Sequence, residues 1–99
     1  MAVYLIVGYD ITDPKGFEDY VPGVVPLLQK HGAEVLVADF ESKALEGEPR
    51  KVNVVLKFSS EEAARNWYND SAYGPVRQIR LSSTTGGYAA IAQEFRPPE

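Results

Sequence analysis

The stretch V-Y-L-I-V-G-Y-D-I at residues 3–11 decides how this chain folds. Successive side chains of an extended strand point to opposite faces, so alternate residues share a face. One face is entirely apolar and carries Val3, Leu5, Val7, Tyr9 and Ile11. The other face is mixed and carries Tyr4, Ile6, Gly8 and Asp10. A strand with one apolar face needs a covering layer, and we expect helices to supply it.

A helix is predicted directly after this strand. Asp13 is suited to cap its amino end, and Pro14 is favoured at a first helical position. Apolar residues then recur at helical spacing as far as Gly32, where the helix should end. This stripe consists of Phe17, Tyr20, Val21, Val24, Leu27 and Leu28. Two prolines inside the span remove backbone hydrogen bonds, so we predict a kink or break near residues 19–23.

Two short valine-rich strands are predicted at residues 33–40 and 51–58. The polar connection between them has turn residues at Gly47 and Pro49, which indicates a long antiparallel hairpin whose arms extend beyond the sheet. In the later strand Val52, Val54, Leu56 and Phe58 share one face. Its opposite face carries Asn53, Val55 and Lys57.

The second helical region is predicted to begin at Ser59, because Ser59 and Glu62 have the spacing of a capping box. Residues 69–71 interrupt it, and a further short helix is expected over residues 73–81.

A loop at residues 84–87 and a last strand at residues 88–95 complete the predicted order β-α-β-β-α-β. This is the α+β, ferredoxin-like arrangement, a four-stranded antiparallel sheet with its helices on one face. We expect residues 1–99 to form a single domain, because a chain of this length has room for only one.

The sheet face without helices would be too apolar for a soluble monomer. Its apolar residues would be Tyr4, Ile6 and Val55, with either Leu36 and Phe40 or Val35 and Val37 from the second strand. We therefore expect two copies to pack sheet to sheet as a homodimer.

Composition and charge exclude several classes of protein. The net charge is −4 and the ten Lys and Arg residues are scattered, so we expect no nucleic-acid partner. The chain has no cysteine, which excludes disulfides and suits the reducing cytoplasm where we expect the protein to act. We expect no membrane partner, because no apolar run reaches about 18 residues.

We also expect no metal and no cofactor. His31 is the only histidine, so no second histidine ligand is present. Gly86 and Gly87 precede a strand rather than a helix, which excludes a phosphate-binding loop.

The order of these features resembles the family called domain of unknown function 1330, within the dimeric α/β-barrel superfamily of ferredoxin-like proteins. The resemblance spans residues 3–92 and rests on several short motifs. They are Ile11-Thr12-Asp13-Pro14, Tyr20, Gly32, Leu45-Glu46-Gly47, the run from Phe58 to Ala64, Trp67-Tyr68, and Tyr73 followed by Arg80. The resemblance implies a homodimer with facing sheets and a small pocket beside each sheet, but no established activity.

Five residues are candidate ligand contacts: Tyr20, His31, Glu46, Trp67 and Arg80. Glu46 and Arg80 recur in the resembling family. If their side chains met near Trp67 and Tyr20, the carboxylate and the guanidinium would orient a small polar ligand. The alternative is an ion pair that joins the hairpin to the helical layer, within one subunit or across the dimer. His31 is the one candidate for a base at neutral pH. The alternative is that it lies at the carboxyl end of a helix, where the helix dipole favours it. Trp67 is alternatively a core residue.

Two functions remain open at this point. The first is binding or transformation of a small organic molecule without a cofactor, in a pocket beside the sheet. The second is a non-catalytic dimeric module, in which the same residues serve packing and assembly. No residue is assigned a catalytic role.

Overall fold

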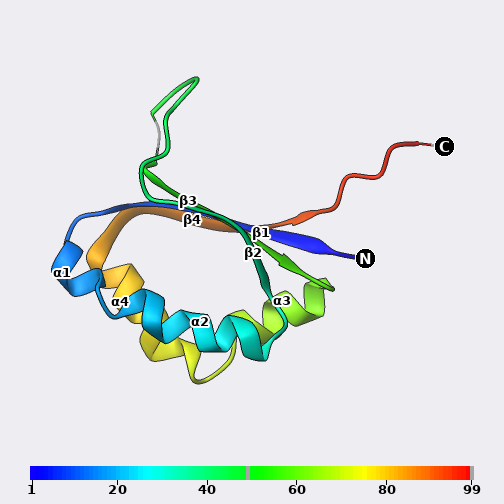
Figure 1. The fold of residues 1–99 in the computed structure, drawn as a ribbon, viewed down its shortest axis with the longest axis horizontal. Coiled ribbons are helices and arrows are strands. Elements are labelled where there is room, and N and C mark those ends of the chain that lie inside the picture. Colours follow the sequence, from blue (N-terminus) through cyan, green and yellow to red (C-terminus); the bar gives the residue numbers. More distant parts are fainter. Residues whose placement is uncertain (49, 99) are drawn as a thin grey trace.

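The computed structural model describes residues 1–48 and 50–98 (Figure 1). The strands are β1 (Val3–Ile11), β2 (Glu34–Asp39), β3 (Val52–Phe58) and β4 (Thr84–Gln93). The helices are α1 (Pro14–Phe17), α2 (Tyr20–Lys30), α3 (Glu61–Tyr68) and α4 (Tyr73–Ser83). The strands form one antiparallel sheet in the order β2-β3-β1-β4. The predicted α+β, ferredoxin-like fold is confirmed.

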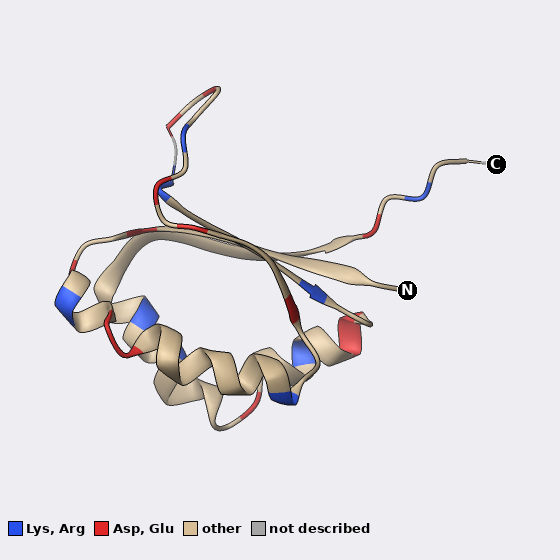
Figure 2. Cartoon of the chain, in the orientation of Figure 1, with Lys and Arg blue, Asp and Glu red and all other residues tan. Residues whose placement is uncertain are grey.

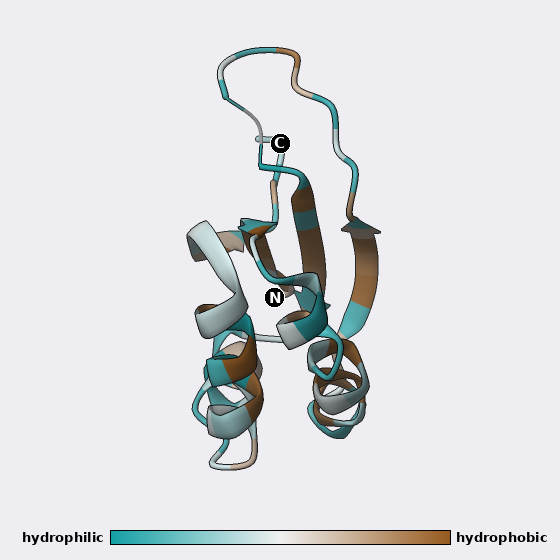
Figure 3. Cartoon of the chain, turned by 90° about the vertical axis from the view of Figure 1, so that its left-hand side faces the viewer, coloured by the Kyte–Doolittle hydropathy of each residue, from teal (hydrophilic) through white to brown (hydrophobic). Residues whose placement is uncertain are grey.

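All four helices lie on one side of the sheet, and the opposite side, here called the outer face, carries no helix (Figure 1). The apolar side of β1 points to the helices as predicted, because Val3, Leu5, Val7 and Tyr9 are each at most 8% exposed. Strand β1 lies between β3 and β4, so it forms the middle of the core. Figure 3 shows the hydrophobic strands, in brown, next to the helical layer.

The predicted break in the first helical region is confirmed. Helix α1 ends at Phe17 and α2 begins at Tyr20, with Asp13 capping α1 by accepting a 3.1 Å hydrogen bond from the Gly16 amide. Pro22 falls in the first turn of α2, where no intrahelical amide bond is required. The break therefore places Pro22 where it costs least, whereas Pro26 lies inside α2.

The predicted start of α3 is wrong by one residue. Ser60, not Ser59, is the N-cap, because its backbone is extended and its hydroxyl oxygen accepts a 3.1 Å hydrogen bond from the Ala63 amide. Glu62 consequently occupies the second helical position, so the predicted capping box does not form. Both Glu61 and Glu62 remain in the first turn, where their negative charges interact favourably with the positive end of the helix dipole.

The predicted loop at residues 84–87 is also wrong, because β4 begins at Thr84, directly after α4. Gly8 pairs with Tyr88 and Asp10 pairs with Thr85, so Gly86 and Gly87 together oppose one residue of β1. This is a β-bulge, and Gly86 adopts a φ of +64° that a residue with a side chain rarely tolerates. The two glycines thus interrupt the register without ending the strand.

Neither predicted set of outer-face residues on β2 is correct, because this strand also contains a bulge. Val35 pairs with Leu56 and Val37 with Val55, so the residue between them is an insertion in the ladder. Val35 therefore shares the helix side of the sheet, whereas Val37 lies on the outer face. Phe40 is also on the helix side, with its ring 6.3 Å from that of Phe17.

The connection between β2 and β3 projects beyond the sheet, as predicted, and points away from the helices (Figures 1 and 3). Leu45, in this hairpin arm, is 100% exposed. None of the helices in residues 1–48 and 50–98 is long and apolar enough to cross a membrane.

Phe58 is 0% exposed and contacts Trp67, with the ring centroids 5.9 Å apart. We expect Phe58→Ala to lower the free energy of unfolding by about 3–5 kcal/mol, because the truncation leaves a cavity. Urea unfolding followed by tryptophan fluorescence measures the change. Phe95→Ala is the control, since Phe95 is 81% exposed and should change stability by less than about 0.5 kcal/mol. Equal effects of the two variants would contradict this description of the core.

Candidate functional site

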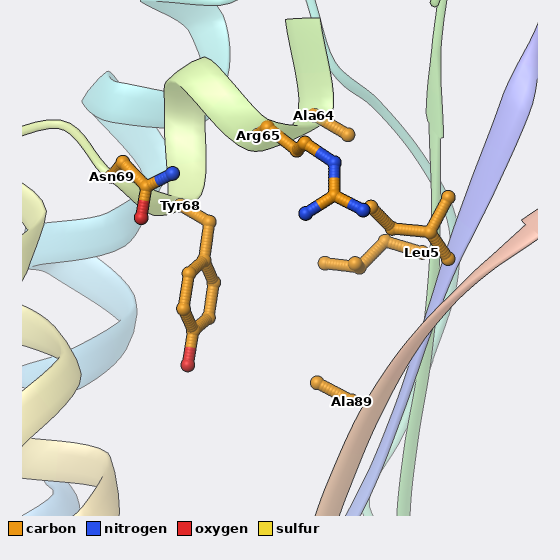
Figure 4. A pocket seen from close by; sticks show the side chains of 7 residues that line it. Leu5, Ala64, Arg65, Tyr68, Asn69 and Ala89 are labelled. Atoms are coloured by element: carbon orange, nitrogen blue, oxygen red, sulfur yellow. The ribbon is translucent and has the colours of Figure 1, made fainter. Parts of the chain in front are cut away.

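Two adjoining hollows lie between the α3–α4 region and the β4 edge of the sheet. The first has a volume of about 360 Å³ and is lined by α3 and by strands β1 and β4. Figure 4 shows Tyr68 and Arg65 reaching from α3 toward the strands that carry Leu5 and Ala89. The second has a volume of about 480 Å³ and is lined by the end of α4 and the start of β4. Tyr68 and Ala89 line both hollows, so the two lie side by side.

Arg80 is the charged residue of the second hollow, and it is only 5% exposed. Its guanidinium carbon lies 5.8 Å from the centre of the Tyr9 ring. Its Nε has no hydrogen-bond partner, and none of the ion pairs in residues 1–48 and 50–98 includes it. Arg80 is therefore a buried cation without a carboxylate counter-ion in the described chain.

Tyr9, Tyr20 and Tyr73 surround this arginine, and the four residues are called the Arg80 cluster below. The hydroxyls of Tyr20 and Tyr73 are 2.8 Å apart and share a hydrogen bond. Burial raises the pKa of Tyr9 to about 12 and raises that of Tyr20 further. At neutral pH these phenols are protonated, so they do not neutralise the guanidinium.

The charge state of Arg80 is settled by two opposing effects. Burial lowers its pKa, whereas the neighbouring Tyr73 and Tyr20 raise it, and the resulting pKa lies above its ordinary value. The guanidinium is consequently always charged.

The end of α4 is held firmly, which fixes where Arg80 lies. The hydroxyl of Thr84 donates to the Arg80 carbonyl at 2.7 Å, and the hydroxyl of Ser83 donates to the Ile79 carbonyl. The Ser83 carbonyl accepts a 2.9 Å hydrogen bond from the Thr12 amide, just after β1. The helix end is therefore tied both to itself and to the strand that carries Tyr9.

The structure places Trp67 in the core beside the Arg80 cluster. Trp67 is 2% exposed and its ring centroid lies 4.4 Å from that of Tyr73. Its indole nitrogen has no hydrogen-bond partner. Trp67 and Tyr20 do not line either hollow, so Arg80 is the one candidate of the five that does.

His31 lies at the carboxyl end of α2 and contacts the α3–α4 corner. Its Nε2 is 2.8 Å from Oδ2 of Asp70, and Nζ of Lys30 donates to the same oxygen at 2.9 Å. The Ala72 amide donates to the other carboxylate oxygen. Hydrogen bonds from His31, Lys30 and the Ala72 amide hold the pKa of Asp70 well below its ordinary value of 3.8. This arrangement joins two helical segments, and none of its three side chains lines either hollow.

Glu46 is exposed in the hairpin arm, which projects away from the helices (Figure 1). The ion pairs of the described residues do not include Glu46 with Arg80, so the two do not meet within one subunit. A pairing across a dimer stays a prediction.

Three aromatic residues were not among the predicted ligand contacts although they belong to the site. Tyr9 and Tyr73 complete the Arg80 cluster, and Tyr68 lines both hollows. The signal for Tyr73 was present in the sequence, because Tyr73 and Arg80 are two helical turns apart and share a helix face. Only the folded chain brings Tyr9 to them.

The fold and the hollows define the chain as a ferredoxin-like α+β protein with a candidate pocket between its helices and one sheet edge. It belongs to the family described as "Domain of unknown function (DUF1330)", whose model matches residues 2–93. The resemblance predicted from the sequence is thereby confirmed. No curated protein matches the chain.

Several solved structures share this fold. A protein of unknown function from Rhodopseudomonas palustris is similar with a TM-score of 0.82 at 13% identity, over 97% of this chain and 84% of that one. A dimeric protein of unknown function from Bacteroides fragilis, described as having a ferredoxin-like fold, gives 0.65 at 10% identity, over 94% and 96%. SnoaB, a cofactor-independent oxygenase from Streptomyces nogalater, gives 0.66 at 11% identity, over 99% and 98%. At these identities the likeness shows the fold alone.

The Asp70 contacts predict a specific dependence of stability on pH. Because the pKa of Asp70 is lowered by folding, its contribution to stability is present above pH 3.8 and is lost as the pH falls below that value. We expect Asp70→Asn to be less stable than the wild type at pH 7, with a difference that shrinks below pH 3.8. Thermal unfolding at a series of pH values measures it. Asp19→Asn is the control, since Asp19 is exposed and makes no side-chain cap bond. A difference independent of pH would contradict the assignment.

Proposed function

We propose that this protein binds or transforms a small organic molecule in the two adjoining hollows without a cofactor. The observation that carries the proposal is Arg80, a buried cation without a counter-ion that lines a hollow of about 480 Å³. Volumes of about 300–1,000 Å³ are typical of ligand pockets. The shared fold with a cofactor-independent oxygenase supports the absence of a cofactor, although by analogy only.

We also propose that the protein is a cytoplasmic homodimer joined through the outer face. The strand register assigns Ile6, Val55 and Ala90 to neighbouring positions on that face, with Val37 beyond them. Most residues of the strands carry no charge (Figure 2). Val37 is 44% exposed, and Tyr88, on the same face, is 49% exposed. A second copy would cover this apolar surface, and a structurally similar protein is described as dimeric.

The second candidate function is a non-catalytic dimeric module. It is favoured by Tyr20 and Trp67, which are 8% and 2% exposed and line neither hollow. Their place in the core is explained by packing alone. The two candidates differ in whether the hollows take up a ligand.

Ligand uptake is tested by a thermal-shift screen of small organic molecules. We expect at least one to raise the melting temperature by several degrees, because a ligand at about 100 times its dissociation constant adds about 2.7 kcal/mol. Ala89→Phe should abolish this shift, since Ala89 lines both hollows and the larger side chain would fill them. Ala44→Phe, in the exposed hairpin arm, should retain it. A screen without any stabilising compound would favour the non-catalytic module.

The homodimer is tested by sedimentation equilibrium at micromolar concentration. We expect a mass of twice 10.9 kDa for the wild type. Val55→Glu should shift the mass toward the monomer, because it would bury a charge between the two outer faces. Val25→Glu, on the outward side of α2, should remain dimeric, since Val25 is 40% exposed on the helical layer. A wild-type mass near 10.9 kDa would refute the proposal.

A further inference from the structure

We infer that the ligand of this pocket is an organic anion, a carboxylate on an apolar or aromatic body, and that Arg80 binds the carboxylate. This inference rests on the proposed function, because it names the class of molecule that the hollows take up.

The first argument concerns charge. The chain has 14 Asp and Glu residues, and the other described ion pairs, formed by Lys30, His31, Arg50 and Arg65, all use them. The side chains of Lys30 and Arg65 are 62% and 64% exposed, so water would solvate them without a partner. Arg80 is 5% exposed and has none. A buried charge is strongly unfavourable unless it is paired, so the missing partner is expected to be an anion from outside the described chain.

The second argument concerns hydrogen bonding. The hydroxyls of Tyr20 and Tyr73 bond to each other beside the guanidinium, and neither tyrosine lines the hollow. A guanidinium has five N–H donors, and the Nε donor of Arg80 has no partner. Arg80, which does line the hollow, therefore offers donors and a positive charge together, which is what a carboxylate requires.

The third argument concerns the size and chemistry of the hollow. At about 480 Å³ it is much larger than an inorganic anion needs. Tyr68, Leu81 and Ala89 supply apolar lining, and no Asp or Glu of residues 1–48 and 50–98 contributes to it. The Gly86-Gly87 bulge contributes backbone to the lining. The lining thus accepts a ring or an aliphatic body and does not repel an anion.

The test compares acids with their neutral amides on the full-length protein. Binding of 1-naphthoate and phenylacetate, and of 1-naphthamide and phenylacetamide, is measured by calorimetry and thermal shift. We expect at least one acid to bind about tenfold more tightly than its amide, because a charge-assisted hydrogen bond adds about that factor. Arg80→Met should abolish the preference, and Arg80→Lys should restore part of it. Met fills the space of the removed side chain without a charge, so the variant is expected to fold.

Arg96→Met is the matched control, since it removes one positive charge from an exposed position and should leave the preference unchanged. If the amides bind as tightly as the acids, the ligand need not be an anion, which overturns the inference but leaves the proposed pocket intact. If inorganic phosphate binds and neither acid does, the ligand is not an organic carboxylate, which also overturns the inference. If no probe binds and the thermal-shift screen also finds nothing, both the inference and the proposed function fail.

A further variant tests whether the counter-ion of Arg80 comes from a ligand or from a partner subunit. If Glu46 of a second copy paired with Arg80, Glu46→Gln would free the guanidinium. We expect Glu46→Gln to bind the acids as the wild type does. An acid that binds Glu46→Gln but not the wild type would assign the counter-ion to Glu46 and overturn the inference.

Discussion

The burial of one face of β1 is the constraint on which the rest of the structure depends. Val3, Leu5, Val7 and Tyr9 form an entirely apolar side of the central strand, whereas the other side includes the charged Asp10, so helices cover the first side without burying charge. The neighbouring strands follow the same alternation because they are paired with β1 in register. Every helix consequently packs on one side, and the outer face is left for another partner.

Arg80 is the exception to this apolar packing, and it marks the site. Helix α4 runs along the core, and its carboxyl end is held by the Ser83 and Thr84 hydroxyls and by the amide of Thr12. That attachment leaves the arginine among phenols rather than in water. Proteins rarely bury a cation without a counter-ion, and for this reason Arg80 carries both the proposed function and the inference about its ligand.

The sequence predicted the elements well because their signals are local. The alternation of β1, the stripe containing Tyr20 and the break between α1 and α2 each follow from residues a few positions apart. The errors occurred where a local signal was ambiguous. Ser59 and Ser60 both suit an N-cap, and the extended backbone after β3 selects the second. Gly86-Gly87 is typical of a loop, but pairing with β1 makes it a bulge.

By itself the sequence determined the fold class, the apolar outer face and the list of candidate residues, since spacing and residue type are written into the chain. Only the tertiary structure decided which candidates lie together. It separated His31, which binds Asp70, from the hollows, and it placed Glu46 far from the helical layer. It also brought Tyr9, Tyr20 and Tyr73 around Arg80, from one strand and two helices. Contacts of this kind depend on packing between distant segments, and the periodicity of one segment contains no information about the side chains of another.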